Sequence, residues 1–185
     1  MTTRENIVKL GDQLIRDKGF NAFSFYDISK ELKIKNASIH YHFPTKTDLG
    51  VSILKDHQEK LYTLIQSTES KSPLIKLNAF LSIYSTIKSE GRVCLVGSLA
   101  TDLNSVDAKI AKELKVFANE ILKWVTSILE EGKTKKKFSF QGSARTKALM
   151  IITNMLAALQ VSRLTNEDDF HTIKNEVIKD LKAKH

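Results

Sequence analysis

Residues 19–49 read GFNAFSFYDISKELKIKNASIHYHFPTKTDL, and this stretch decides how the whole chain is interpreted. Ser24 is positioned to cap a helix, because a serine before an apolar-periodic run accepts hydrogen bonds from the first free N–H groups of that helix. Helical spacing predicts that this helix turns three residues toward a core: Phe25, Ile28 and Leu32.

A second, very short helix is predicted from about Asn36 to Phe43, with Ile39 and Phe43 turned inward. Pro44 ends it, because the residue before a proline is pushed out of the α region. Two helices joined by a tight turn, the second too short to be stable alone, are typical of a helix-turn-helix.

His40 and His42 could indicate a metal site, a catalytic pair or a surface that touches another molecule. They are two residues apart, so on a helix they point roughly 200° away from each other. Metal ligands on one helix need spacings of three or four, and a catalytic pair of histidines fails for the same reason. The spacing therefore favours the surface interpretation.

The second helix of such a motif enters the DNA major groove. An asparagine can read adenine with two hydrogen bonds, an alanine can touch a thymine methyl, and serine, tyrosine and lysine can reach bases or phosphates. We therefore predict ten DNA-contacting residues: Ser24, Tyr26, Lys35, Asn36, Ala37, Ser38, His40, Tyr41, His42 and Lys46. The alternative is a solvated helical hairpin with ordinary surface residues.

Composition favours a globular all-α chain. There are only two prolines and seven glycines in 185 residues, and hydrophobic residues make up 42%.

The single Cys94 indicates a reducing compartment, and no signal peptide or membrane-length apolar run is present, so a cytoplasmic protein is expected. The net charge of +8 suggests a polyanionic partner. The lysines of 133–137 are interpreted as a solvated loop, with a second nucleic-acid contact as the alternative.

Helical periodicity continues on both sides of the opening stretch. A first helix should end at Gly19, and Thr45 with Asp48 should begin a long helix that runs to about Thr68. The remaining helices are predicted at about 73–89, 94–102, 106–131, 143–164 and 167–183.

The stretch 19–49 resembles the DNA-binding signature of the TetR/AcrR family, with Gly19-Phe20, Ser24, Asp27-Ile28, the Tyr-His-Phe block and Lys46 in the family's order. The resemblance covers residues 3–50, and it implies nine helices, a DNA-binding domain at 1–47 and a ligand-binding and dimerisation domain at 48–185. Two positions depart from the family pattern. Lys33 stands where members often have glycine, and His40 where they often have tyrosine.

The resemblance also implies a homodimer through the last two helices, a double-stranded DNA operator and a small-molecule inducer. The run 148–161 is apolar nearly all round, as expected of a helix buried on both its own core and a partner. Candidate ligand-binding residues are Phe80, Tyr84, Cys94, Phe117, Trp124, Asn154 and Met155, with Gln160 as a further polar candidate. Aromatic residues at helical spacing are equally expected of an ordinary core.

Cys94 has two interpretations. The stretch GRVCLVG at 91–97 resembles a segment of a TetR subgroup that includes a repressor answering reactive electrophiles, and a helix N-terminus would make the thiol more nucleophilic. The alternative is a buried apolar filler.

We therefore expect a repressor released from a palindromic operator by an inducer, with no enzymatic activity, no cofactor and no metal. A transcriptional activator on the same fold and a helical ligand carrier without specific DNA binding are the alternatives.

Overall fold

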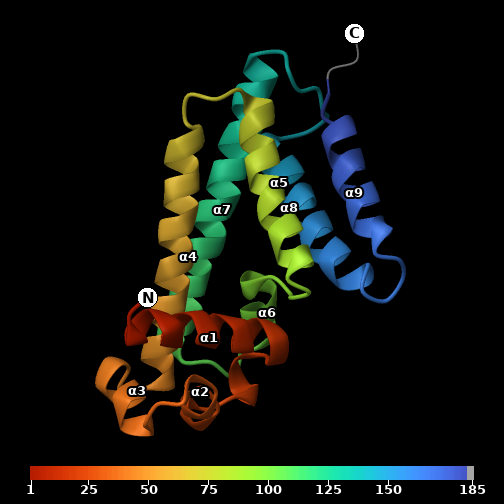
Figure 1. The fold of residues 1–185 in the computed structure, drawn as a ribbon. Helices are drawn as coiled ribbons and strands as arrows, with labels where there is room; N and C mark the ends of the chain where they lie inside the picture. Colours follow the sequence, from red (N-terminus) through yellow and green to blue (C-terminus); the bar gives the residue numbers. More distant parts are fainter. Residues whose placement is uncertain (183–185) are drawn as a thin grey trace. The chain divides into compact units, whose positions relative to one another are not determined.

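The computed structural model describes residues 1–182 and confirms the all-α prediction (Figure 1). Within the described residues there are nine α-helices and one short 3-10 helix and no strand. The helices are α1 (Thr3–Lys18), η1 (Phe20–Ala22), α2 (Phe25–Leu32), α3 (Asn36–His42), α4 (Lys46–Thr68), α5 (Pro73–Ser89), α6 (Leu95–Thr101), α7 (Ala108–Thr134), α8 (Ala144–Val161) and α9 (Asp168–Lys179).

Side-chain caps explain why several helices begin where they do. Ser24, the predicted cap, forms a capping box with Asp27 at α2, and Ser72 caps α5, whose first residue is a proline. At α4 the Thr45 N–H donates to Asp48 Oδ2 at 3.0 Å, and the Asp48 N–H donates to Thr45 Oγ1 at 3.1 Å. These short-range bonds are readable from local sequence, so the predicted starts are close to the observed ones.

The C-terminal ends of α7 and α9 differ from the predicted ends. We expected α7 to end near residue 131, but Gly132 is helical and α7 continues to Thr134. The Phe138 ring folds back onto Gly132, where a Cβ atom would lie 1.9 Å from Phe138 Cδ2. The last helix was predicted to reach 183, which lies outside the described residues; the observed α9 ends at Lys179.

The described chain forms two compact units. The first comprises Met1–Lys60 and Arg92–Ala118, so α6 and the start of α7 belong with the N-terminal helices. In this unit α1 packs on α2, α3 and α6. Its core consists mainly of aliphatic side chains and phenylalanines: Ile7, Ile15, Phe20, Phe23, Ile28, Ile39, Phe43, Leu49, Ile53, Leu99 and Ile110.

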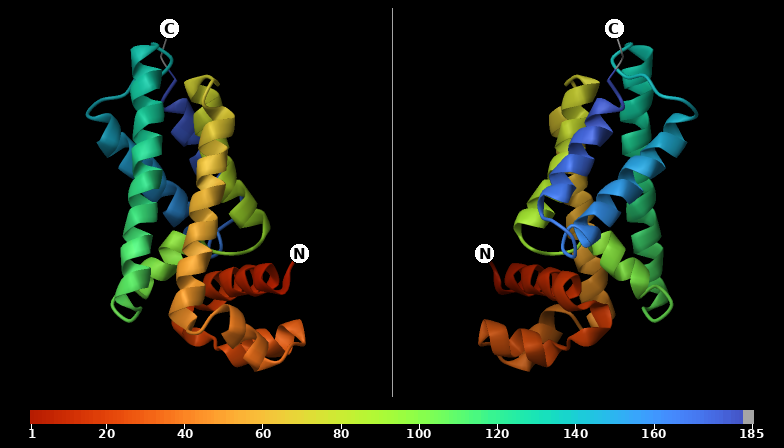
Figure 2. Two further views of the ribbon diagram at one scale, coloured as in Figure 1. Left: turned by 90° about the vertical axis from the view of Figure 1, so that its left-hand side faces the viewer. Right: turned by 90° about the vertical axis from the view of Figure 1, so that its right-hand side faces the viewer.

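The second unit comprises Leu61–Gly91 and the chain from Asn119 onward. Here α8 packs on α5 and on α9, and Figure 2 shows these C-terminal helices from opposite sides. Its buried residues include Leu77, Phe80, Leu81, Val125, Leu129, Ile151, Met155 and Phe170. No helix among residues 1–182 has the length and apolar character needed to cross a membrane.

Candidate nucleic-acid interface

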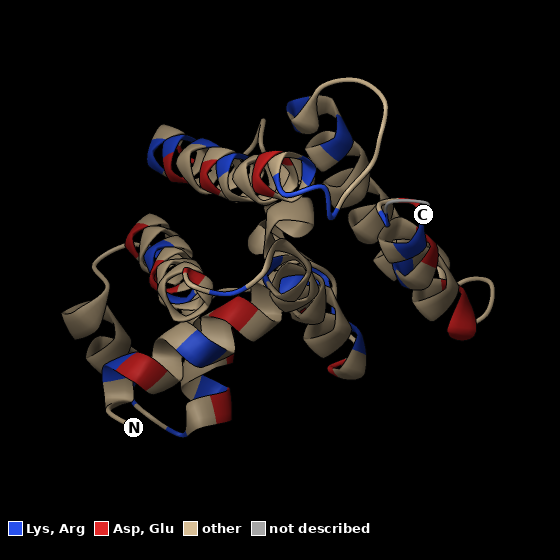
Figure 3. Ribbon diagram, turned by 90° about the horizontal axis from the view of Figure 1, so that it is seen from above, with Lys and Arg blue, Asp and Glu red and all other residues tan. Residues whose placement is uncertain are grey.

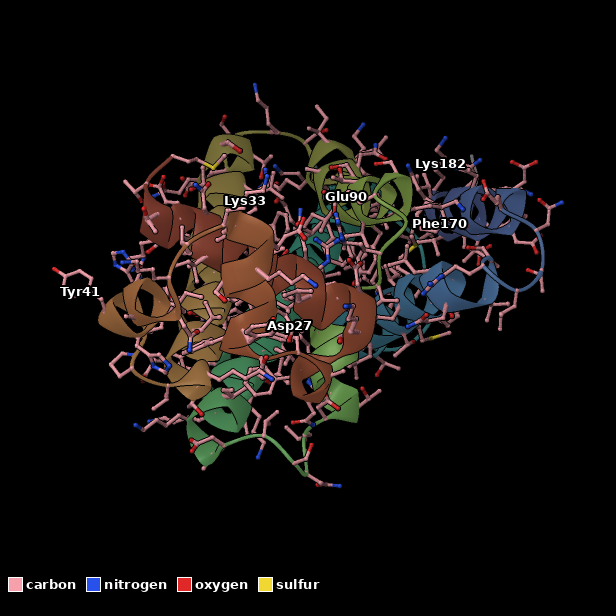
Figure 4. All side chains as sticks on the ribbon, turned by 60° about the horizontal axis from the view of Figure 1, so that its bottom comes forward. Asp27, Lys33, Tyr41, Glu90, Phe170 and Lys182 are labelled. Carbon is pink, nitrogen blue, oxygen red and sulfur yellow. The ribbon has the colours of Figure 1, made fainter. Side chains whose placement is uncertain are left out.

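The short helix α3 is anchored by its apolar face and presents its polar face to solvent. Ile39 is 0% exposed and Phe43, which caps the helix, is 2% exposed. Asn36, Ala37 and Tyr41 are exposed, Ser38 and His42 are partly exposed, and Lys35 is the exposed N-cap residue. The Tyr41 side chain is 84% exposed and projects away from the ribbon in Figure 4. An exposed aromatic and an exposed amide on one short helix are expected of a surface that contacts another molecule.

The two histidines of α3 have separate surroundings. The His40 ring packs edge-on against Phe25 at 5.0 Å, and its Nδ1 lies 3.3 Å from the Pro44 carbonyl oxygen. The His42 ring packs edge-on against Tyr41 at 5.1 Å. In the described part of the chain no group of three or more His, Cys, Asp or Glu is arranged to hold a metal ion.

The turn between α2 and α3 is left-handed at Lys33, with φ 54° and ψ 40°. A side chain in this conformation costs roughly 1–2 kcal/mol relative to glycine. The turn is held by the Ile34 N–H, which donates to the Ser29 carbonyl at 3.0 Å, and Ser29 is itself buried. The left-handed turn between α2 and α3 therefore forms with lysine in place of the glycine that is common at this position in the resembled family.

The N-terminus of α2 carries Ser24 and Asp27, with Tyr26 68% exposed beside them. The Ser24 N–H and hydroxyl both donate to Asp27 Oδ2 at 2.7 Å. These hydrogen bonds hold the pKa of the Asp27 carboxyl below its ordinary value. The helix end is therefore well ordered. A carboxylate lies at the place where Ser24 was expected to meet a phosphate.

Lys46, predicted to contact phosphate, is packed against the segment before α2. Its ammonium donates to the Phe23 carbonyl and lies 4.7 Å from the Phe20 ring centroid and 4.1 Å from that of Phe23. Burial lowers the pKa of this ammonium, while the carboxylates of Asp102 and Asp27 act in the opposite direction. Lys46 therefore ties the start of α4 to the turn that precedes α2.

Segment 92–105 is fastened to the end of α1 and to η1 by hydrogen bonds across 75 to 84 residues of sequence. The Arg16 Nε donates to the Val93 carbonyl at 3.0 Å, and the Ser98 hydroxyl donates to the Ile15 carbonyl at 2.7 Å. Three further bonds join Arg92 to Asp17 (3.1 Å), Phe20 N–H to Asp102 (2.8 Å) and Asn21 to Ser105 (2.7 Å). We call these five bonds the α1–α6 clamp. Sequence reasoning missed it, because single residues carry no mark of partners so far along the chain.

A second polar cluster joins α1 to α4. Asp12 accepts from Arg16 Nη1 at 3.2 Å and contacts His57 Nε2 at 2.8 Å, and the His57 ring packs at 6.1 Å from Phe117. Burial raises the pKa of Asp12, but the hydrogen bond and charge of His57 and the guanidinium of Arg16 outweigh burial, so the pKa lies below its ordinary value. Asp12 is therefore charged and bound on both sides.

The predicted ligand-binding residues do not form one group within a single unit. Phe80, Tyr84 and Trp124 lie together in the second unit, with ring centroids 5.4 Å (Phe80 to Tyr84) and 6.1 Å (Phe80 to Trp124) apart. Met155 is fully buried in the same unit, whereas Phe117 and Cys94 belong to the first unit.

Asn154 and Gln160 were expected to supply polar contacts inside the body. Both are exposed. Asn154 shares a helical face with the exposed Met150, four residues earlier, rather than with the buried Met155. The apolar pattern of 148–161 hid this, because a helix that is apolar nearly all round does not reveal which face is inner.

Cys94 is the N-cap residue of α6. Burial raises the pKa of its thiol, and the N–H groups of Gly97 and Val96 and the charge of Arg16 act in the opposite direction but do not offset burial. The expectation that the helix N-terminus and nearby cations lower the pKa of Cys94 is therefore wrong: desolvation outweighs both. Cys94 is partly exposed, so the raised pKa of its thiol is the observation that favours the apolar-filler interpretation.

Comparison with known proteins matches this geometry. The family model described as "Bacterial regulatory proteins, tetR family" matches residues 7–52. A TetR transcriptional regulator from Legionella pneumophila is 31% identical, with 98% of both chains covered and a TM-score of 0.87. A TetR-family regulator from Agrobacterium tumefaciens is 25% identical over 97% of both chains, with a TM-score of 0.89.

Among curated proteins, the transcriptional repressor NemR of Escherichia coli K12 is 22% identical over 84% of this chain and 81% of its own length. The 31% identity to the Legionella regulator extends over nearly the whole of both chains, and the family model falls on the helix-turn-helix described above. The chain therefore belongs to the TetR family of bacterial transcriptional regulators.

Proposed function

We propose that this regulator is a homodimeric repressor that binds a palindromic DNA operator and is released by a small-molecule inducer. The observation that carries the proposal is the presentation of α3. Its apolar side is sealed into the first unit by Ile39 and Phe43, while Asn36, Ala37 and Tyr41 project to solvent. The curated relative NemR is named a repressor, which supports the sign of regulation.

In this proposal α3 lies in the major groove and its N-terminal residues read base edges. Asn36 is placed to bond adenine, Ala37 to contact a thymine methyl, and Ser38 to bond a base or a phosphate. Lys35, Tyr41, His42 and Tyr26 lie around them and suit phosphate contacts, which set register without reading sequence. Affinity should then fall steeply with salt, because each phosphate contact releases counterions.

The dimer in this proposal is formed by α8 and α9. Apolar side chains stand exposed on these two helices: Met150 (52%), Val161 (50%), Ile173 (40%) and Leu149 (38%), with Leu164 (87%) in the turn between them. Exposure of these apolar side chains to water does not stabilise a monomer, whereas an isologous dimer interface would bury them. Two-fold symmetry predicts the palindromic operator, and binding of two half-sites one DNA turn apart would require the α3 helices to lie about 34–36 Å apart.

Inducer binding is proposed in the second unit, at the aromatic cluster of Phe80, Tyr84 and Trp124, with Met155 buried in the same unit. An inducer acts only if it binds the non-DNA-binding conformation more tightly than the other. A route to the DNA-binding helices is covalent: α5 ends at Ser89, and the chain passes directly through Gly91 into Arg92 and the α1–α6 clamp. A shift at the end of α5 would therefore strain the hydrogen bonds of the α1–α6 clamp, which hold α1.

The test begins with genome-wide footprinting to identify the operator. Binding of that duplex is then compared for wild type, Asn36→Ala and Asn104→Ala, a matched control at an exposed asparagine outside the helix-turn-helix. We expect Asn36→Ala to weaken operator binding by about 1–3 kcal/mol and to relax the preference at one base position. Asn104→Ala should bind as wild type does. Unchanged affinity and base preference for Asn36→Ala would contradict the reading role of α3.

Repression is separated from activation by a promoter assay. Transcription from a promoter that carries the footprinted site is measured with and without the protein. We expect transcription to fall when the protein is added and to recover when inducer is present. A rise on addition of the protein would identify an activator instead.

A further inference from the structure

The positive charge of this protein is concentrated in a place that the helix-turn-helix does not use. Residues 132–166 contain seven Lys and Arg and no Asp or Glu, so the rest of the chain carries 22 basic against 21 acidic residues. Nearly all of the net charge of +8 therefore comes from this part of the second unit. Seen from above in Figure 3, α8 and the loop that leads into it carry blue and no red.

Six of these residues form what we call the basic segment: Lys133, Lys135, Lys136, Lys137, Arg145 and Lys147. Five of them are exposed and Lys147 is partly exposed. Within the described residues, Lys135 is the only one of the six with an ion pair, at 2.6 Å from Glu131. Lys133 lies in the last turn of α7, where the helix dipole favours a cation. The other four cations of the segment, Lys136, Lys137, Arg145 and Lys147, have no ion pair within the described residues and repel one another.

The turn that carries these lysines is held by backbone hydrogen bonds. Lys136 adopts φ 53°, and the N–H groups of Lys137 and Phe138 both donate to the Gly132 carbonyl, at 2.8 and 3.0 Å. Phe138 is buried, and the Ser139 N–H donates to the Leu181 carbonyl at 2.9 Å, so the turn is fixed to the end of α9. Lys133 Nζ lies 5.0 Å from the Phe140 ring centroid. The lysines are thus presented outward from a fixed backbone.

The start of α8 adds charge of the same sign. Arg145 and Lys147 lie in its first turn, which contains no acidic residue. Cations at a helix N-terminus are unfavourable, because the aligned peptide dipoles place partial positive charge there. An anionic partner would relieve both this repulsion and that among the lysines.

We propose that the basic segment binds the phosphate backbone of a nucleic-acid duplex, independently of α3. A lipid surface fits less well, because an interfacial helix inserts apolar side chains, and the exposed large apolar residues of the described chain all lie outside 132–147. A regulator of this family works among duplex DNA at high local concentration. Ordered, outward-facing lysines and an arginine without base-reading neighbours suit an interaction that ignores sequence.

The experiment compares two triple variants of the full-length protein that remove the same amount of charge. Lys136→Gln/Lys137→Gln/Arg145→Gln removes three exposed cations of the segment. Lys109→Gln/Lys112→Gln/Lys123→Gln removes three exposed lysines of α7 and is the matched control. Circular dichroism melting verifies that both remain folded. Binding of a 40-base-pair random-sequence duplex is measured by fluorescence anisotropy over a salt series.

We expect the segment variant to bind the random duplex more weakly and to show a salt slope smaller by about 0.9 for each phosphate that the segment no longer neutralises. The control variant should keep the wild-type slope. The difference should persist when Asn36→Ala is added to both, because the two surfaces bind independently. Equal slopes for the two triple variants would overturn the proposal.

A parallel titration with poly-glutamate tests the class of partner. An equal loss of binding to poly-glutamate and to duplex would overturn the assignment to nucleic acid in favour of an acidic protein surface. The α3 proposal is tested separately, because its outcome is the base preference of Asn36→Ala and not the salt slope.

Discussion

The Lys46 ammonium lies 4.1 Å from the centroid of the Phe23 ring and donates to the carbonyl of the same residue. Lys46→Ala should therefore loosen the turn before α2 as well as remove the cation that was predicted to bind phosphate. We expect a decrease of about 1 kcal/mol in the free energy of unfolding, and weaker binding to operator and random duplexes alike. Urea unfolding and anisotropy titration measure the two effects. Unchanged affinity together with an unchanged salt slope would show that Lys46 does not bind phosphate.

Arg16 is 8% exposed and joins Asp12 on its own helix to the Val93 carbonyl of the α1–α6 clamp. Arg16→Ala should lower the free energy of unfolding by about 3 kcal/mol, since it leaves a largely buried carboxylate without one of its partners. Arg16→Lys should recover only part of this loss, because an ammonium lacks the fork that reaches both oxygens. Chemical denaturation of the three proteins provides the comparison. A loss below about 0.5 kcal/mol for Arg16→Ala, the range of an ordinary surface substitution, would mean that the clamp does not depend on this residue.

The lowered pKa of Asp12 predicts how the free energy of unfolding changes with pH in the acid range. Its pKa in the folded chain lies below its ordinary value, so its contribution is fully present above the ordinary pKa of about 3.9 and is lost as pH falls through the folded value. We expect the stability difference between wild type and Asp12→Asn to shrink as pH falls from about 5 to below about 4. Urea midpoints over this range measure it. A difference that grew with acid would reverse the assigned sign.

Gly132 lies under the Phe138 ring, where an added Cβ would approach Cδ2 to 1.9 Å. Gly132→Ala should therefore displace the ring and destabilise the protein by about 1–3 kcal/mol, although alanine is the better helix former. Adding Phe138→Ala should remove the clash, so the double variant should be destabilised by less than the sum of the two single variants. Thermal unfolding of all four proteins tests this. Strict additivity would show that the ring does not pack on Gly132.

Cys94 should react slowly in the native protein, because burial raises its thiol pKa and keeps the nucleophilic thiolate scarce. The chain has one cysteine, so labelling by N-ethylmaleimide reports on this residue alone. We expect labelling to be about tenfold slower or more in buffer than in urea, and the reagent to release operator DNA equally from wild type and Cys94→Ser. Fast native labelling, with release abolished in Cys94→Ser, would establish the sensor interpretation instead.

Local sequence was enough to predict the helices and the exposed face of α3. The cap at Ser24, the stop at Pro44 and the inward spacing of Ile39 and Phe43 depend on neighbours within a few residues, and the structure has all three. The left-handed turn at Lys33 could also be expected, because the resembled family often has glycine there.

Tertiary structure alone decided how these helices are held and what their side chains can do. The partners of Arg16, Asp102 and Lys46 are brought close only by folding, across 23 to 82 residues of sequence. The same holds for Cys94, whose helix N-terminus favours a reactive thiol while its burial opposes one. Helix formation follows from interactions between near neighbours, whereas desolvation and long-range hydrogen bonds depend on which distant residues pack together, and a single sequence carries no local record of that.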